Sequence, residues 1–151
     1  MSKATTTKIF PQANSLAMVS ASIDMMNGSE GIRASLIADV AGMSARQGAY
    51  YAKAVQFLGL ATYDAATKTY KLNKEGVRVK RMGTKKRFEY IASVTAENPV
   101  FAKTYLGKNV TKTDLKRSGL DKMSESTRNR RLSTVQAWKN SLQDNLAVAV
   151  A

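Results

Sequence analysis

The chain has 151 residues, and its 24 lysines and arginines outweigh 11 aspartates and glutamates to give a formal net charge of +13. It contains no cysteine and no histidine, which excludes disulfides, thiol nucleophiles, histidine bases and nearly every zinc site. So large a positive charge is typical of a protein that binds a polyanion, with nucleic acid ahead of an anionic membrane.

The first half of the chain predicts three short helices. Residues 1–13 are small, polar and interrupted by a proline, so we expect a flexible segment there. A first helix follows from Asn14, with apolar residues at helical spacing, and a second lies in "IRASLIADVAGM" and stops near Gly42. Ser44 is placed to cap a third helix, which closes at Gly59.

A β-hairpin is predicted directly after the third helix. The segment "LATYDAATKTYKLNKEG" alternates apolar and polar residues on both sides of a polar turn at residues 64–68. Three short helices followed by a hairpin form a winged helix-turn-helix. We assign this domain to residues 14–80.

Residues 81–144 predict a second, helical module, so the fold class is mainly α. The basic stretch "VRVKRMGTKKRFEY" contains one glycine and is interpreted as the junction between the two domains. Four helices are expected in this module. The first contains Phe88, the second begins at Pro99, the third is capped by Thr111 or Thr113, and the fourth is capped by Ser124. The tail, residues 145–151, is expected to be flexible.

The two halves share a weak repeat. Aligning residues 43–56 with 123–136 without gaps gives four identities, which are Met43 with Met123, Ser44 with Ser124, Val55 with Val135, and Gln56 with Gln136. Both segments open a long helix with Met-Ser after a shorter one. We therefore interpret the second module as another helix-turn-helix, related to the first by duplication.

Each of these long helices has an apolar side and a polar side, because successive residues turn about 100° around a helix axis. The apolar sides are predicted to face the core, and they carry Gly48, Tyr51, Ala52, Val55 and Leu58, then Leu132, Val135, Trp138 and Leu142. The polar sides supply the candidate DNA contacts, which are Arg46, Gln47, Tyr50 and Lys53, then Ser126, Asn129 and Arg130. Arg128 and Arg131 fall beside the apolar side, so their role stays open; Arg131 could bond a carboxylate or helix-end carbonyls.

Arginine and tyrosine on the first turns of a helix fit a major groove, where they reach base edges or phosphates. Two further groups of cations are candidates for backbone contacts. Lys68 and Lys71 flank the hairpin turn, and the basic junction supplies Arg81, Lys85, Lys86 and Arg87. For each group the alternative is an ordinary solvated surface.

Signals for catalysis are poor. The acid and lysine of "DLK", Asp114 and Lys116, match the end of a metal-dependent nuclease pattern, but the expected upstream acid on a strand is missing. We find no glycine-rich phosphate loop and no nucleophile beside a base. We therefore expect no catalytic residue, no metal site and no cofactor, and we expect that the protein is not an enzyme.

Two stretches resemble known families. "IADVAGMSARQGAYYAKAVQFLGLA" with "YKLNKEG" resembles the core of winged-helix DNA-binding domains. "MSESTRNRRLSTVQAW" is similar to helix-turn-helix modules attached to restriction–modification enzymes and related defence proteins. These resemblances imply a DNA-recognition module or a regulator of transcription, and they do not identify its target.

The sequence thus favours a protein that binds double-stranded DNA. RNA is an alternative ligand. The sequence does not decide whether the protein forms a homodimer. The alternatives from other classes are an adaptor or inhibitor that docks onto an acidic partner, and the recognition domain of a nuclease. No signal peptide or membrane span is found in the sequence, so we expect no membrane partner and a cytoplasmic location, at the nucleoid if the protein binds DNA.

Overall fold

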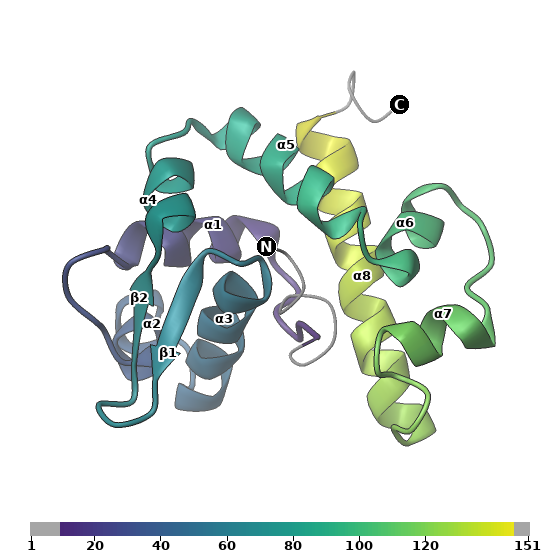
Figure 1. The fold of residues 1–151 in the computed structure, drawn as a ribbon, viewed down its shortest axis with the longest axis horizontal. Coiled ribbons are helices and arrows are strands. Elements are labelled where there is room, and N and C mark those ends of the chain that lie inside the picture. Colours follow the sequence, from purple (N-terminus) through teal and green to yellow (C-terminus); the bar gives the residue numbers. More distant parts are fainter. Residues whose placement is uncertain (1–9, 147–151) are drawn as a thin grey trace.

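The computed structural model describes residues 10–146, which are mainly α-helical with one small antiparallel sheet, as the sequence predicted. The elements in chain order are α1 (Leu16–Met25), α2 (Ala34–Ala41), α3 (Ala45–Phe57), β1 (Ala61–Asp64), β2 (Thr69–Leu72), α4 (Lys74–Lys80), α5 (Thr84–Thr95), α6 (Pro99–Tyr105), α7 (Lys112–Arg117) and α8 (Glu125–Asn145). In Figure 1 the elements from α1 to α4 form one half of the molecule and α6 to α8 the other, and α5 crosses between them.

The helices begin where local chemistry satisfies their free backbone N–H groups. The Ser44 hydroxyl accepts a hydrogen bond from the Gln47 N–H at the start of α3, and Ser124 accepts one from Thr127 at the start of α8. Thr111 and Asp114 form a capping box at α7, and Pro99 occupies the first turn of α6. These predicted helix starts are confirmed.

The contact between α2 and α3 depends on two glycines. Gly42 ends α2 with a φ of 70°, a left-handed conformation that favours glycine. At Gly48 an added Cβ would lie 2.7 Å from the Ala34 carbonyl oxygen and 2.8 Å from the Ala38 Cβ. The absence of a side chain at Gly48 therefore lets the two helices pack closely.

The predicted hairpin is present. Strands β1 and β2 pair antiparallel, with Ala61 opposite Leu72 and Asp64 opposite Thr69. The link between α1 and α2 joins this sheet through an isolated bridge, in which the Ile32 N–H donates to the Tyr70 carbonyl and the Tyr70 N–H donates back. The hairpin is thus tied to the helices by backbone bonds.

The basic junction is helical, which the sequence analysis did not predict. Asn73 caps α4 by accepting from the Gly76 N–H, and its side-chain amide donates to the Gly59 carbonyl. Val79 of α4 is fully buried. Only Arg81, Met82 and Gly83 separate α4 from α5, so the expected linker is a tight corner between two helices.

One hydrophobic core spans both halves, although the sequence analysis placed a domain boundary between residues 80 and 81. The ring of Phe57, in α3, lies 5.8 Å from that of Phe101, in α6, and 6.4 Å from that of Trp138, in α8. All three side chains belong to a single buried cluster. The two halves therefore share their packing across the expected boundary.

The N-terminal segment was expected to be flexible up to residue 13, but its end is packed into this core. Phe10 and Ala13 are buried, and the Trp138 indole N–H donates to the Ala13 carbonyl at 2.6 Å. Residues 1–9 lie outside the described part of the chain, as do residues 147–151 of the predicted tail. Within that predicted tail, Asn145 still belongs to α8 and Leu146 is buried.

The two segments of the proposed repeat, residues 43–56 and 123–136, have only partly similar structural surroundings. Val55 and Val135 are both fully buried, as aligned, and both long helices have a serine cap. The turn before α3 has three residues, 42–44, whereas the turn before α8 has seven, 118–124. Furthermore, the main contacts of α7 are with α6, while α2 packs directly on α3.

Candidate nucleic-acid interface

The polar side of α3 faces solvent, as its sequence pattern predicted. Arg46, Gln47 and Lys53 are exposed and Tyr50 is half-buried. The Arg46 Nε donates to the Tyr50 hydroxyl at 2.7 Å, and its guanidinium carbon lies 5.8 Å from the centre of the Tyr50 ring. Because only Nε is used in this contact, the two terminal nitrogens of Arg46 stay available to fork onto a phosphate or a guanine.

The polar side of α8 is also exposed at Ser126, Asn129 and Arg130. Within residues 10–146, the side chain of Arg130 makes one long hydrogen bond, at 3.5 Å, with the Thr127 hydroxyl. Behind it, the Thr134 hydroxyl donates to the Asn14 side-chain oxygen at 2.6 Å. This bond attaches the segment before α1 to α8.

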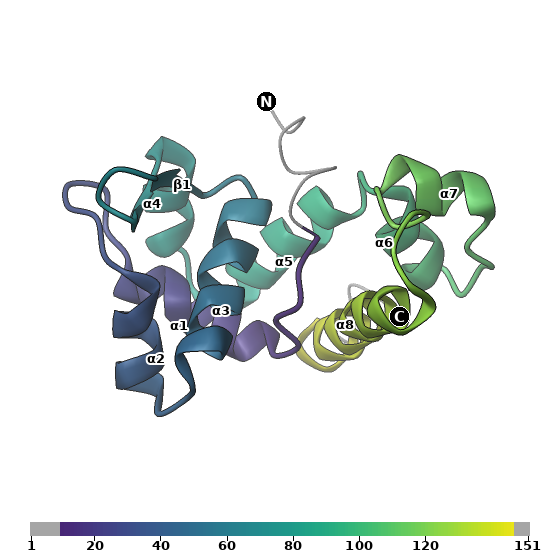
Figure 2. The ribbon, with the colours of Figure 1, turned by 90° about the horizontal axis from the view of Figure 1, so that it is seen from below.

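The polar sides of α3 and α8 meet at one open hollow, which we call the α3/α8 groove. Its lining residues are Gln12, Asn14, Arg46, Gln47, Tyr50, Arg130, Ser133 and Thr134. Figure 2 shows the chain before α1 running between the two helices. The structure thus brings together predicted contacts that lie 80 or more residues apart, whereas Ser126 and Asn129 are exposed outside the groove lining.

A second hollow adjoins the groove and shares Gln12 and Tyr50 with it. It is lined by Phe10, Pro11, Gln12, Tyr50, Lys53, Met123 and Arg131, and we call it the Arg131 hollow. Burial, together with the charge of Arg130, lowers the pKa of the Arg131 guanidinium, while Tyr50 acts in the opposite direction. The carboxylate or carbonyl partner suggested for Arg131 by the sequence is absent among residues 10–146; Arg128 instead donates to the Met123 carbonyl.

Gln12 and Asn14 also line the groove, although no sequence pattern predicted it. Both residues lie in or next to a stretch that was expected to be flexible. The phenylalanine at position 10, the first described residue, is the one local signal for a packed segment there. Its burial, and the side chains on α8 that the segment contacts, depend on tertiary structure.

The hairpin lysines lie apart from the α3/α8 groove. Figures 1 and 2 both place α3 between the hairpin and α8. Lys68 and Lys71 are exposed, and Lys68, the last residue of the turn before β2, has a φ of 58°. In Figure 1 the tip of the hairpin lies at the same end of the molecule as the first turns of α3 and α8.

The remaining predicted contacts lie at the corner between α4 and α5, where Arg78, Arg81, Lys85 and Lys86 line a shallow hollow. In Figure 1 this corner is at the opposite end of its half of the molecule from the first turn of α3. It therefore does not continue the α3/α8 groove.

Arg87 does not fit the predicted interface. Its side chain is buried, with 7% of the residue exposed. One terminal nitrogen, Nη1, donates to the carbonyl and hydroxyl of Ser20, and the other, Nη2, donates to the Asp24 carboxylate and the Lys80 carbonyl. The prediction that Arg87 contacts phosphate is corrected: it joins α5 to α1 and α4.

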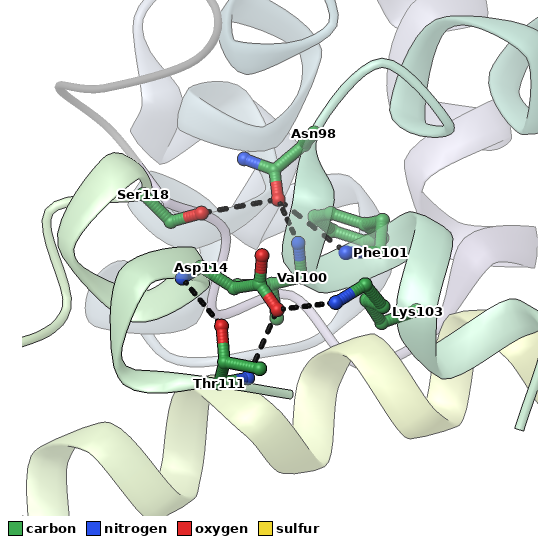
Figure 3. Close-up of polar contacts among 7 residues, drawn as sticks. All are labelled: Asn98, Val100, Phe101, Lys103, Thr111, Asp114 and Ser118. Carbon is green, nitrogen blue, oxygen red and sulfur yellow. Dashed lines mark hydrogen bonds and ion pairs between the residues drawn. The ribbon is translucent and has the colours of Figure 1, made fainter. Parts of the chain in front are cut away.

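Asp114 has a structural role. Its Oδ2 atom accepts from the Thr111 N–H at 2.9 Å and from the Lys103 Nζ at 3.0 Å, as Figure 3 shows. These bonds, that of the Thr111 N–H first, lower the pKa of the Asp114 carboxyl from 3.8 to about 2. Asp114 is buried and Lys116 is exposed, so the two residues of the nuclease-like pattern do not face one site.

Asn98, the cap residue of α6, belongs to the same group of polar side chains around α7. Its side-chain oxygen accepts from the N–H groups of Val100 and Phe101 and from the Ser118 hydroxyl (Figure 3). The polar cluster around α7 therefore satisfies helix ends. Across residues 10–146 there is no group of three or more acidic side chains that could hold a metal ion.

The fold and the groove together define a mainly α-helical protein with cationic and polar side chains from two helices around one hollow. Residues 22–145 match the model of a family described as a domain of unknown function, DUF7226. The chain belongs to this family, and the match runs from α1 to the last residue of α8. No curated protein and no solved structure matches the chain. Within the described residues, no helix is both long and apolar enough to cross a membrane.

Proposed function

We propose that this protein binds double-stranded DNA through the α3/α8 groove. The observation that carries the proposal is the shared lining of this groove by Arg46, Gln47 and Tyr50 of α3 and by Arg130 of α8. A base edge or phosphate that enters the groove would meet donors from both helices. The net charge of +13 would speed and strengthen the encounter with a polyanion.

In this proposal α1, α2, α3 and the hairpin act as a winged helix. The first turns of α3 would enter the major groove, with the Arg46 fork on a base edge or phosphate. Lys68 and Lys71 would contact the backbone from the other side of α3. The α8 face would add Arg130 and the exposed Ser126 and Asn129, as the second reading element of a recognition module or a regulator.

The proposal makes a quantitative prediction about salt. If six to ten phosphates are neutralised, the logarithm of the binding constant should fall with the logarithm of salt concentration with a slope of about −5 to −9. Fluorescence anisotropy of a labelled random duplex at several salt concentrations measures this slope. Binding that stays constant between low and moderate salt would contradict the proposal.

RNA and double-stranded DNA are separated by competition. Unbiased selection of bound duplexes from a random pool, with a structured RNA as competitor, gives the preferred ligand directly. Enrichment of duplex sequences in the presence of RNA supports the DNA proposal, and displacement by RNA at equal concentration overturns it in favour of RNA.

A protein-docking role is the second candidate, because α2 exposes two apolar side chains one turn apart. Leu36 is 42% exposed and Val40 is 64% exposed. If docking is the function, the unchanged protein would bind a protein partner and no duplex. A Leu36→Ser/Val40→Ser variant would then lose that partner. Duplex binding that this variant retains would favour the DNA proposal.

A further inference from the structure

Arg131 is half-buried and lacks the partners that such an arginine usually has. Its Nε and Nη1 atoms are covered by protein, and neither forms a hydrogen bond with any group in residues 10–146. The neighbouring Arg128 provides a contrast, because its Nη1 donates to the Met123 carbonyl at 3.0 Å. Arg87 also has a covered Nε without a partner, but both of its terminal nitrogens are bonded, whereas Arg131 has two covered nitrogens that form no hydrogen bond in residues 10–146.

An unpaired guanidinium that has lost water destabilises the fold, since neither hydration nor a counter-charge compensates its burial. The lowered pKa of Arg131 agrees with this, because burial is its first cause and the charge of Arg130 is its second. No carboxylate is among the described residues that line the Arg131 hollow. Among residues 10–146, the hollow therefore supplies no counter-charge for Arg131.

The side chains around the hollow fit a phosphate group. Lys53 is exposed on the same hollow and supplies a second positive charge. The Tyr50 hydroxyl accepts a hydrogen bond from Arg46, so its own proton is free to be donated. A guanidinium, an ammonium and a hydroxyl around one hollow offer several donors, and a phosphate has several acceptor oxygens.

We propose that the Arg131 hollow is a phosphate-binding site, with Arg131 as the buried cation, Lys53 as the outer cation and Tyr50 as a neutral donor. Because Tyr50 also lines the α3/α8 groove, a phosphate in the hollow lies next to the surface that contacts bases in the proposed function. The identity of this phosphate as one of the DNA backbone rests on that proposed function; the site itself does not.

The proposal gives Arg131→Met two opposite effects. The substitution removes the unpaired charge and keeps an apolar side chain of similar length, so the melting temperature without ligand should rise by a few degrees. The same variant should bind duplex about 10-fold more weakly and reduce the magnitude of the salt slope by about one, since one charged contact is lost. Arg128→Met is the matched control: it loses the bond to Met123, so its melting temperature should fall while its duplex binding stays unchanged.

The direct test is the NMR signal of the Arg131 Nε–Hε group in the unchanged protein, assigned with Arg131→Met. It is titrated with inorganic phosphate at constant ionic strength, with sodium chloride as the reference, and separately with duplex DNA. The proposal predicts a saturable shift of this signal with both ligands and none with chloride.

The outcomes separate the two proposals. Duplex binding that leaves the Arg131 signal unmoved would overturn the phosphate site while the proposed function stands. A shift with inorganic phosphate in a protein that binds no duplex would support the site, with free phosphate groups as its ligand, and would contradict the DNA-binding proposal. A fall in the melting temperature of Arg131→Met with unchanged duplex affinity would also overturn the site.

Discussion

Two basic surfaces within residues 10–146, the α3/α8 groove and the corner between α4 and α5, are built differently. At the corner, six cations lie within ten residues of sequence, from Arg78 to Arg87. Arg87 points inward, and Arg78 is paired with Glu75. At the groove, the cations are sparse in sequence but come from two helices that meet at one hollow. The comparison shows that the density of charge along a sequence is a poor guide to where a ligand binds.

The two surfaces also differ in what their charges do for the fold. Arg87 makes four hydrogen bonds and connects three helices. Among the described residues, the side chain of Arg46 donates a hydrogen bond only to Tyr50, on the next turn of the same helix. A charge used within the protein is not available to a ligand, so Arg87 cannot contact DNA, whereas the two terminal nitrogens of Arg46 can.

The largest effect is expected at the corner, on stability. Arg87→Ala removes four hydrogen bonds from a buried guanidinium, and it should lower the free energy of unfolding by about 2–4 kcal/mol. For a protein of this size the melting temperature should fall by roughly 5–15 °C. The control is Lys86→Ala at the adjacent exposed position, which should change stability by less than about 0.5 kcal/mol. Equal melting temperatures for the two variants would show that the corner is one solvated surface.

The next effect concerns recognition by the groove. Arg46→Ala and Tyr50→Ala should each weaken binding to the preferred duplex by about 10-fold or more, and they should alter the preferred sequence, because both side chains are placed to reach base edges. Binding-site selection on the two variants measures the change. If both variants keep the original preference and lose affinity for all duplexes alike, the groove contacts only the backbone.

A smaller and uniform effect is expected at the hairpin. Lys71→Ala should weaken binding to all duplexes by about two- to fourfold and reduce the magnitude of the salt slope by about 0.9, as for one lost phosphate contact. Measurement of the slope for a preferred and a random duplex tests this. A slope equal to that of the unchanged protein would place the hairpin outside the interface.

The smallest effect is expected on stability, when a buried acidic residue and an exposed one are each replaced by asparagine. Asp114→Asn removes the carboxylate charge that strengthens the bonds from the Thr111 N–H and Lys103, so the melting temperature at neutral pH should fall by a few degrees, while Asp121→Asn, at an exposed position, should change little. The pKa of Asp114 is lowered from 3.8 to about 2. Its stabilising effect is therefore full above about pH 4 and is lost as the pH falls through 2.

Thermal unfolding of both variants between pH 7 and pH 2 tests this dependence. The difference between Asp114→Asn and the unchanged protein should be constant above pH 4 and should shrink below it. A difference that is constant down to pH 2 would show that the carboxylate charge of Asp114 does not stabilise the fold.

Much of the local structure could be predicted from the sequence. Cap residues such as Ser44 and Ser124, the left-handed glycine at position 42 and the alternation around residues 64–68 act over a few residues, so their signals lie within short windows. The helix α4 was missed because its sequence is short and strongly charged. Its stability comes from the Asn73 cap and from the burial of Val79.

The site could be predicted only in part, because its residues come together through tertiary contacts. Helical periodicity correctly placed Arg46 and Arg130 on exposed sides, but it holds no information on whether those sides meet. The inward turn of Arg87 depends on Ser20 and Asp24, more than 60 residues away. The place of Gln12 at the groove depends on the packing of Phe10 and Ala13 into a core shared by both halves.

The most direct test of the central claim compares two double substitutions that each remove two positive charges. Arg46→Ala/Arg130→Ala changes the groove, and Lys85→Ala/Lys86→Ala changes the corner. The affinity of both variants for one duplex is measured at the same salt concentration. If DNA lies in the groove, the groove pair should lose at least about 10-fold more affinity than the corner pair. Equal losses of affinity would mean that binding depends only on the net charge of the protein, and that the groove has no special role.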